Sequence, residues 1–253
     1  MRFRELFLGA LLIPATALTT LACSGGDDVV LAPSTTSSAV TCKVSPGEDI
    51  CGRTFDLPEK DRAHLVAFLQ IAAIFAGEAH EAFERVFAAC DAMGRDVGAV
   101  GVSIPEADVI TKRKASCQAV GKAIESLGAG AFVISAGAQS CTALEAPVCA
   151  TSSRYQVPAR TRCDPPVVTV DDQSGDPKRA AMAASLQRQL PELVWFRHQI
   201  SQLTTLAHMF VTVGEQPPMA CAAESVKLLT TAVAELQAAV EGSALVDVSI
   251  SVQ

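Results

Sequence analysis

The feature that most constrains the fold is a set of four segments whose apolar residues recur every three or four positions. This spacing places the apolar side chains on one face of an α-helix. The first segment starts near Asp56, a helix-capping residue, with Pro58 and Glu59 in the first turn, and it has stop signals at Gly94 and Gly98. Its apolar stripe comprises Leu65, Phe68, Ala72, Phe75, Ala79, Phe83, Val86, Cys90 and Met93.

The other three periodic segments predict helices over residues 103–128, 176–214 and 218–242, each bounded by a Pro near its start and a Gly at its end. Pro191 lies inside the third and predicts a kink there. The sequence therefore predicts a mainly α protein: an antiparallel bundle of four long helices.

Short apolar runs follow the second and fourth segments. Leu245–Val252 alternates apolar and polar residues, which is typical of a strand. We expect this segment and residues 132–136 to form one small β-sheet. The chain would then contain two copies of a helix–helix–strand plan, residues 42–138 and 176–253.

The segment between these two copies, residues 139–175, holds three cysteines and four prolines. Such a composition favours irregular structure. We predict a cysteine-rich connector with one short strand at Arg154–Val157.

The N-terminus predicts export and lipidation. Two arginines precede an apolar run, Leu6–Leu18, and the small residue Ala22 precedes Cys23. This pattern resembles a bacterial lipoprotein signal, in which the cysteine is lipidated and becomes the mature N-terminus; an ordinary secretory signal cut near Ala22 or later is the alternative. The apolar run is shorter than the ~20 residues of a membrane span, and Pro14 interrupts it. Ser24 after the cysteine favours the outer membrane by the same resemblance.

This N-terminus divides the chain into three parts. Residues 1–22 are the predicted signal peptide. Residues 23–41 are rich in Ser, Thr, Gly, Pro and Asp, a composition that predicts a flexible tether. Residues 42–253 are predicted to form a single helical domain.

The charge of the mature chain argues against nucleic acid as a partner. Without residues 1–22 the chain has 18 basic and 26 acidic residues, a net charge of −8. Nucleic-acid binding needs clustered Lys and Arg. The one dense basic run, Lys112–Lys114, is better interpreted as a solvated helix face.

Eight cysteines besides Cys23 predict four disulfide bonds in an oxidising compartment: Cys42, Cys51, Cys90, Cys117, Cys141, Cys149, Cys163 and Cys221. The absence of any Cys-x-x-Cys motif disfavours zinc-ribbon, thioredoxin and c-type haem sites. Cys90 and Cys117 are the best-placed pair, because both fall on buried stripes of successive helices that we expect to form a hairpin. Cys42 and Cys51 are candidates to close a small N-terminal loop, and a buried free thiol is the alternative for each pair.

The first helix carries the densest group of metal-ligating residue types. His80 and Glu84 are four residues apart and share a face, with Glu78 and Glu81 nearby. Di-metal sites in helical bundles use Glu-x-x-His, a spacing that this chain does not contain. We interpret the group as a solvated acidic face and expect no metal site.

The remaining histidines, His64, His198 and His208, show no ligand spacing among themselves. His198 follows Trp195 and Arg197 near the predicted kink. These side chains would either line a pocket or form a helix–helix contact with polar tips in water, which is the commoner arrangement.

No catalytic motif is present. The chain lacks the Gly-x-Ser-x-Gly elbow and the phosphate-binding Gly-x-x-x-x-Gly-Lys-Ser/Thr loop, and its cysteines are expected to be paired. We therefore expect no enzyme activity and no cofactor.

Several local features resemble a group of cysteine-rich myxobacterial outer-membrane lipoproteins. They are the lipid cysteine with its Ser-Gly-Gly tether, Cys90-Asp91, Cys117-Gln118-Ala119-Val120, Ala146-Pro147-Val148-Cys149, Cys163-Asp164 and Val248-Ser249-Ile250-Ser251-Val252. The resemblance covers most of the mature chain and implies a cell-envelope lipoprotein. It implies no activity.

Three classes of function remain. The first is a non-catalytic envelope lipoprotein, anchored in outer-membrane lipid through Cys23, that binds or scaffolds another envelope protein. The second is a carrier of an apolar ligand between the helices. The third is an envelope hydrolase whose site has no recognisable motif. The negative evidence on catalysis favours the first.

Overall fold

The structure is a computed structural model of the chain, and it describes residues 42–99, 108–127, 132–150, 157–172, 174–212 and 221–247. The chain divides into two units, Met1–Ala39 and Val40–Gln253, and all described residues belong to the second. The predicted signal peptide, Cys23 and the tether lie outside the described residues.

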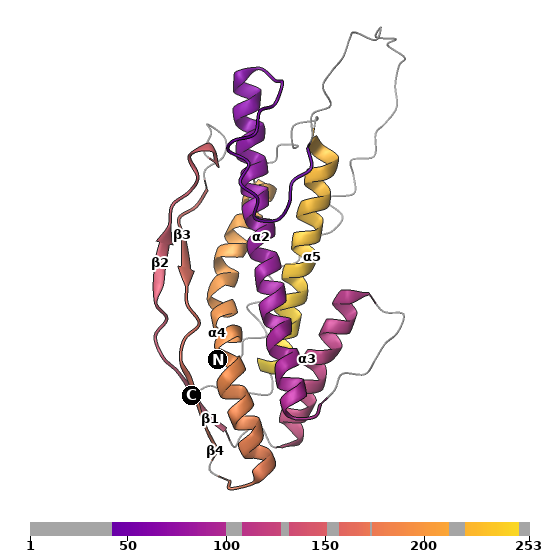
Figure 1. Cartoon of the computed structure of the whole chain (residues 1–253), viewed down its shortest axis with the longest axis vertical. Helices are drawn as coiled ribbons and strands as arrows, with labels where there is room; N and C mark the ends of the chain where they lie inside the picture. Colours follow the sequence, from indigo (N-terminus) through magenta and orange to yellow (C-terminus); the bar gives the residue numbers. More distant parts are fainter. Residues whose placement is uncertain are drawn as a thin grey trace. The chain divides into compact units, whose positions relative to one another are not determined.

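Four long helices form the body of this unit: α2 (Glu59–Asp96), α3 (Val109–Ser126), α4 (Pro177–Thr212) and α5 (Ala222–Asp247) (Figure 1). The prediction of a mainly helical protein with a small β component is confirmed. All nine residues of the stripe predicted for the first helix are buried in α2. At the start of α3, Asp108 accepts a hydrogen bond from the backbone N–H of Thr111 at 2.9 Å, which caps the helix.

α2 is the central helix, because it packs against α3, α4 and α5. By length and composition it could also cross a membrane, and it is the single such helix among the described residues. However, 72% of its most apolar stretch is buried inside the fold. Packing against three helices therefore accounts for the apolar character of α2.

The contacts of α2 fix the direction of α4 and α5. Arg85 of α2 meets Glu192, and Asp96, eleven residues later, meets Ser185, so α4 runs antiparallel to α2. His80 of α2 meets Glu235 of α5, whereas Phe87 lies against the later residue Gly242. α5 therefore runs parallel to α2.

α3 also runs parallel to α2. Arg113 of α3 bonds to Glu84, and Val120 lies beside Gly94, so residue numbers rise together along the two helices. The expected antiparallel arrangement is thus wrong for α3, which does not form a hairpin with α2. The connector between them, residues 97–108, has twelve residues and can reach ~40 Å. This length allows the chain to return along α2 before α3 begins.

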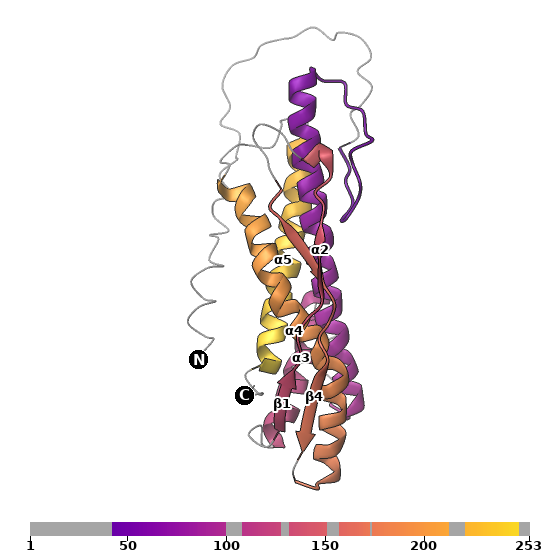
Figure 2. The same cartoon turned by 90° about the vertical axis from the view of Figure 1, so that its left-hand side faces the viewer.

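The β component is an interrupted two-stranded ribbon (Figure 2). Strand β1 (Phe132–Ala136) pairs with β4 (Val168–Asp172), and β2 (Cys141–Leu144) pairs with β3 (Arg160–Cys163), both antiparallel. Backbone hydrogen bonds from Gly137 to Val167 and from Asp164 to Ser140 connect the two pairs. A short 3₁₀ helix, η3 (Val148–Ala150), follows β2.

The ribbon corrects two predictions about strands. The connector 139–175 is not irregular, since it contains β2, β3 and β4. The predicted strand at 154–157 falls mostly outside the described residues, and Val157 belongs to no strand.

The predicted sheet between residues 132–136 and 245–252 is wrong, because β1 pairs with β4 and Leu245–Asp247 are the last residues of α5. Val246 continues the buried helical stripe of Ala232, Leu236 and Ala239. The remainder of that predicted strand, residues 248–252, lies outside the described residues. The two-copy plan required a strand over residues 245–252, and the described part of that segment, Leu245–Asp247, is helical instead.

Four disulfide bonds join the eight cysteines: Cys42–Cys221, Cys51–Cys149, Cys90–Cys117 and Cys141–Cys163. The predicted Cys90–Cys117 pair is present, between parallel helices rather than across a hairpin. The predicted Cys42–Cys51 loop is wrong. The segment between these two cysteines lies along α2, where the backbone N–H of Gly47 bonds to the carbonyl of Ala73, so each cysteine reaches a different distant partner.

Candidate functional site

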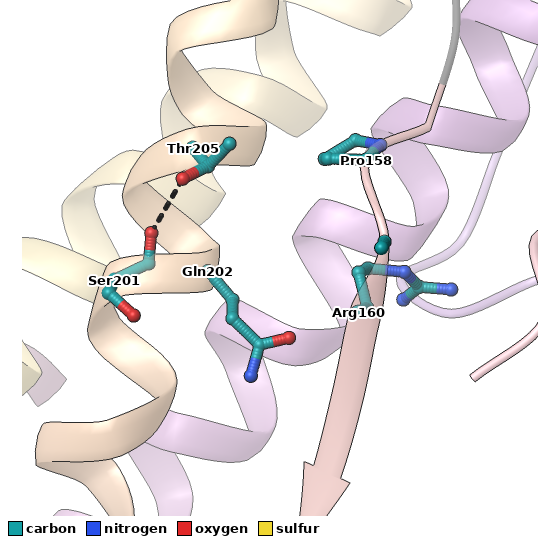
Figure 3. A pocket seen from close by; sticks show the side chains of 6 residues that line it. Pro158, Arg160, Ser201, Gln202 and Thr205 are labelled. Carbon is teal, nitrogen blue, oxygen red and sulfur yellow. Dashed lines mark hydrogen bonds between the residues drawn. The ribbon is translucent and has the colours of Figure 1, made fainter. Parts of the chain in front are cut away.

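A small groove of mixed polarity lies between strand β3 and helix α4 (Figure 3). It has a volume of about 120 Å³ and is lined by Pro158, Ala159, Arg160, Ser201, Gln202 and Thr205. Ser201 and Gln202 each precede Thr205 by about one turn, so all three lie on the side of α4 that borders the groove. Most small-molecule sites are larger, at roughly 300–1,000 Å³. The groove can hold a few water molecules or one small polar group.

Gln202 fixes the strand side of the groove to α4. Its side-chain oxygen accepts a hydrogen bond from the backbone N–H of Thr161 at 2.7 Å, and its side-chain nitrogen donates to the carbonyl of Thr161 at 3.1 Å. The same nitrogen lies 3.0 Å from the Thr161 hydroxyl. Gln202 therefore bonds to both the N–H and the C=O of Thr161, on the edge of β3 that faces α4, as a neighbouring strand would.

Arg160 forms the charged side of the groove. It is 9% exposed and forms an ion pair with Glu78 of α2. Burial raises the pKa of Glu78 above its usual value, and the positive charge of Arg160 partly opposes this rise. The next residue on the same face of β3, Arg162, lies 3.6 Å from Glu81. These two pairs attach β3 to α2, while Gln202 attaches it to α4.

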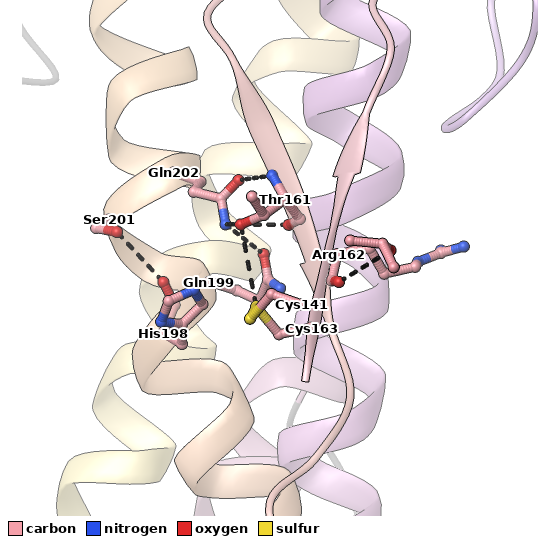
Figure 4. The surroundings of a disulfide bond; sticks show 9 residues. Cys141, Thr161, Arg162, Cys163, His198, Gln199, Ser201 and Gln202 are labelled. Atoms are coloured by element: carbon pink, nitrogen blue, oxygen red, sulfur yellow. Dashed lines mark hydrogen bonds between the residues drawn. A yellow bond between two sulfur atoms is a disulfide. The ribbon is translucent and has the colours of Figure 1, made fainter. Parts of the chain in front are cut away.

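A disulfide and a histidine lie one turn of α4 from the groove (Figure 4). Cys141 and Cys163 are opposite each other in the β2–β3 register and form a disulfide bond. One nitrogen of His198 and the two sulfur atoms lie within 4.8 Å of one another. His198 precedes Gln202 by four residues, so the same face of α4 carries both.

The acidic group predicted on the first helix is dispersed among different partners. His80 Nδ1 lies 3.1 Å from Glu235, Glu84 bonds to Arg113 at 3.1 Å, and Glu78 pairs with Arg160. These contacts join α2 to α5, α3 and β3, and Glu78 is partly buried rather than solvated as expected.

The segment around Pro191 forms a helix contact at Trp195. The guanidinium of Arg85 lies 3.8 Å from the centre of the Trp195 ring, which is 5% exposed. His198 lies beside Cys141 and Cys163 of the ribbon. Of the other two histidines, His208 is exposed on α4 and His64 is half-buried on α2. Of the two arrangements expected near the kink, the helix–helix contact is present at Trp195, and His198 lies beside a disulfide instead.

Sequence reasoning missed Gln202, Thr161 and the meeting of His198 with a disulfide. Pairing His198 with Cys141 and Cys163 requires the course of the ribbon along α4, which no local pattern in the chain reveals. The spacing of His198, Ser201, Gln202 and Thr205 was the available signal, since it places four polar residues within about two turns on one side of a helix.

The chain matches no protein-family model, no curated protein and no solved structure. Its function is therefore argued from the sequence and from the geometry above.

Proposed function

We propose that this protein is a non-catalytic, lipid-anchored protein of the cell envelope that binds another envelope protein along the free edge of strand β2. The anchor is Cys23, attached to the outer membrane, and its support is the signal-like sequence that precedes it. The observation that carries the binding role is the exposed edge of β2.

The hydrogen-bonding pattern of the ribbon defines that edge. Both backbone groups of Thr161 bond to Gln202, so Thr161 and its partner Ala143 form a pair without mutual backbone hydrogen bonds. Hydrogen-bonded and non-hydrogen-bonded pairs alternate along an antiparallel ladder. Cys141 and Cys163 are two positions from Ala143 and Thr161, so they also form a non-hydrogen-bonded pair. The N–H and C=O groups of Cys141 and Ala143 therefore point away from β3, toward the outer side of β2.

The edge lacks two of the features that normally block strand addition, proline and charged side chains. The side chains of Cys141, Thr142 and Ala143 are exposed, and β2 contains neither Pro nor a charged residue. Edge strands are usually protected by such residues, and an unprotected edge can pair with an extended segment of another protein. The disulfide to β3 and the two attachments of β3 keep this edge rigid, which lowers the entropic cost of binding.

The groove gives less support to the alternatives. Its volume is below that of typical ligand pockets, and its lining is partly polar. An apolar-ligand carrier or a hydrolase would need a larger cavity or converging catalytic groups, and this groove supplies neither.

The binding proposal is tested by site-specific crosslinking in intact cells. A photo-reactive residue at Glu145, exposed just after β2, should form an adduct, and the same residue at exposed Lys227 on α5 should not. Ala143→Pro removes one outward N–H and should abolish the adduct, whereas Ala143→Val keeps it. Both variants are compared by circular dichroism to show that the fold is retained. An adduct that survives Ala143→Pro would contradict edge pairing.

The anchor is tested separately by intact-mass analysis of the mature protein. We expect an N-terminal Cys23 carrying acyl mass, and an unanchored or unprocessed product from Cys23→Ser. A mature N-terminus at another residue, without acyl mass, would exclude the lipoprotein proposal. Membrane fractionation then distinguishes outer-membrane from inner-membrane anchoring.

A further inference from the structure

The meeting of Cys141, Cys163 and His198 has a chemical consequence beyond protein binding. Two sulfur atoms and one imidazole nitrogen within 4.8 Å of one another form the donor set that Zn²⁺ prefers. Cys141 and His198 are exposed, and Cys163 is 2% exposed. The three donors come from β2, β3 and α4, so the fold itself assembles them.

We propose that these three residues form a redox-gated site for a thiophilic divalent cation, Zn²⁺. With the disulfide closed, neither sulfur is a thiolate and the site does not bind the cation. Reduction by a dithiol opens it. One reductant thiolate attacks a sulfur of the bridge and forms a mixed disulfide, and the second reductant thiol then closes its own disulfide. Two electrons and two protons pass to Cys141 and Cys163, and Zn²⁺ binding displaces protons from the resulting thiols.

The surrounding contacts keep the donors together after the bridge opens. Gln202 holds Thr161, two residues from Cys163, through both of its backbone groups. The hydrogen bond from the backbone N–H of Asp164 to the carbonyl of Ser140, at 2.9 Å, closes the ribbon on the other side of the cysteines. Tetrahedral zinc places two thiolates about 3.8 Å apart, since each Zn–S bond is about 2.3 Å. Side-chain rotation within the fixed ribbon supplies this separation.

Among the four disulfide bonds, Cys141–Cys163 is both accessible to a reductant and close to a third possible metal ligand, His198. Cys90 and Cys117 are fully buried, and Cys42 and Cys221 are 9% and 2% exposed. Cys51 is exposed, so the Cys51–Cys149 bridge is also reached by a reductant. In the part of the chain that the structure describes, however, the cluster with His198 is the one group of three metal-ligating side chains at this distance. Three protein ligands leave the fourth position to water.

The test uses the full chain, reduced with dithiothreitol under anaerobic conditions and separated from the reductant by gel filtration. Alkylation and mass analysis identify which cysteines were reduced. We expect the reduced protein to bind one Zn²⁺ in competition with a chromophoric chelator, and the oxidised protein to bind none. Co²⁺ in place of Zn²⁺ should show thiolate-to-metal charge-transfer absorption.

Matched variants assign the site. His198→Ala leaves the disulfide intact in the oxidised protein and should lower the zinc affinity of the reduced protein by at least about tenfold, the lower range for losing even an outer-shell partner of a metal ligand. His208→Ala, another exposed histidine of α4, should leave the affinity unchanged. Removing Cys51 and Cys149 together should also leave it unchanged.

Four outcomes would overturn the proposal. They are zinc binding by the oxidised protein, no binding by the reduced protein, equal affinity in His198→Ala, and loss of helical circular dichroism on opening of this bridge. The last result would show that the ribbon does not hold its ligands without the disulfide. All four are distinct from failure of edge pairing, which is measured by crosslinking in intact cells.

Discussion

A Cβ atom on Gly77 would lie 2.7 Å from the Cα atom of Gly47, so the N-terminal segment and α2 touch backbone against backbone at this point. Gly47 has a φ of 73°, a left-handed conformation that side chains disfavour. Its N–H donates to the carbonyl of Ala73 at 2.7 Å. The close approach of two glycines thus allows the N-terminal segment, residues 42–58, to pack directly against the central helix α2.

Gly77→Ala should destabilise the protein by about 1–3 kcal/mol, the usual cost of overpacking. Alanine favours helix by ~1 kcal/mol over glycine, but the added methyl group meets backbone atoms that cannot rotate away. Chemical denaturation measures the change. Gly52→Ala is the control, because a Cβ there would meet nothing within 4 Å. Equal stability of Gly77→Ala and the parent chain would contradict the close backbone contact between Gly47 and Gly77.

Arg85 should be irreplaceable by lysine. Its guanidinium lies over the ring of Trp195 and bonds to Glu192 at 2.6 Å and to Glu81 at 3.2 Å. Lysine cannot stack and form both bonds at once, so Arg85→Lys should cost about 1 kcal/mol. Trp195 is the chain's single tryptophan, and its fluorescence reports the change directly. An unchanged emission spectrum and unfolding midpoint would exclude this contact between α2 and α4.

Asp96 should give the protein a measurable sensitivity to acid. Hydrogen bonds from Ser185 at 2.7 Å and Arg188 at 2.8 Å hold the pKa of Asp96 below its usual 3.8. A lowered pKa in the folded state means that this stabilisation is present above pH 3.8 and is lost as the pH falls through the lower, folded-state value. Asp96→Asn should therefore be less stable at neutral pH, and the difference should shrink below pH 3.8. Thermal midpoints from pH 7 to pH 2 test this, and a constant difference would contradict it.

The four disulfides should appear in peptide mapping under non-reducing conditions as Cys42–Cys221, Cys51–Cys149, Cys90–Cys117 and Cys141–Cys163. Removing Cys42 and Cys221 together should cost about 2–5 kcal/mol, because that bridge closes the longest loop. A peptide that joins Cys42 to Cys51 would contradict the structure.

The helices were predictable because their signals are local. The nine apolar residues of the first stripe recur at helical spacing, and all nine are buried in α2. The end of α5 was not predictable. Over a segment as short as Leu245–Val252, alternation of apolar and polar residues does not exclude a helix. In the structure Val246 follows the three-and-four spacing of the preceding turns instead.

The candidate site depends on non-local relationships that the sequence does not contain. The direction of α3 relative to α2 depends on where a twelve-residue connector returns. Cys42 and Cys51 are neighbours in sequence, yet each bonds to a cysteine at least 98 residues away. His198 meets Cys141 and Cys163 because the ribbon lies along α4, and no local pattern in the sequence relates these three residues.

The bond between Cys42 and Cys221 also determines how the domain responds to mechanical force. Cys42 is the first described residue, and Cys221 directly precedes α5. When the chain is pulled between a point before residue 42 and α5, the tension therefore passes through this covalent bond. Residues 43–220 form a closed covalent loop outside that path, so such a pull cannot draw them out as an extended chain.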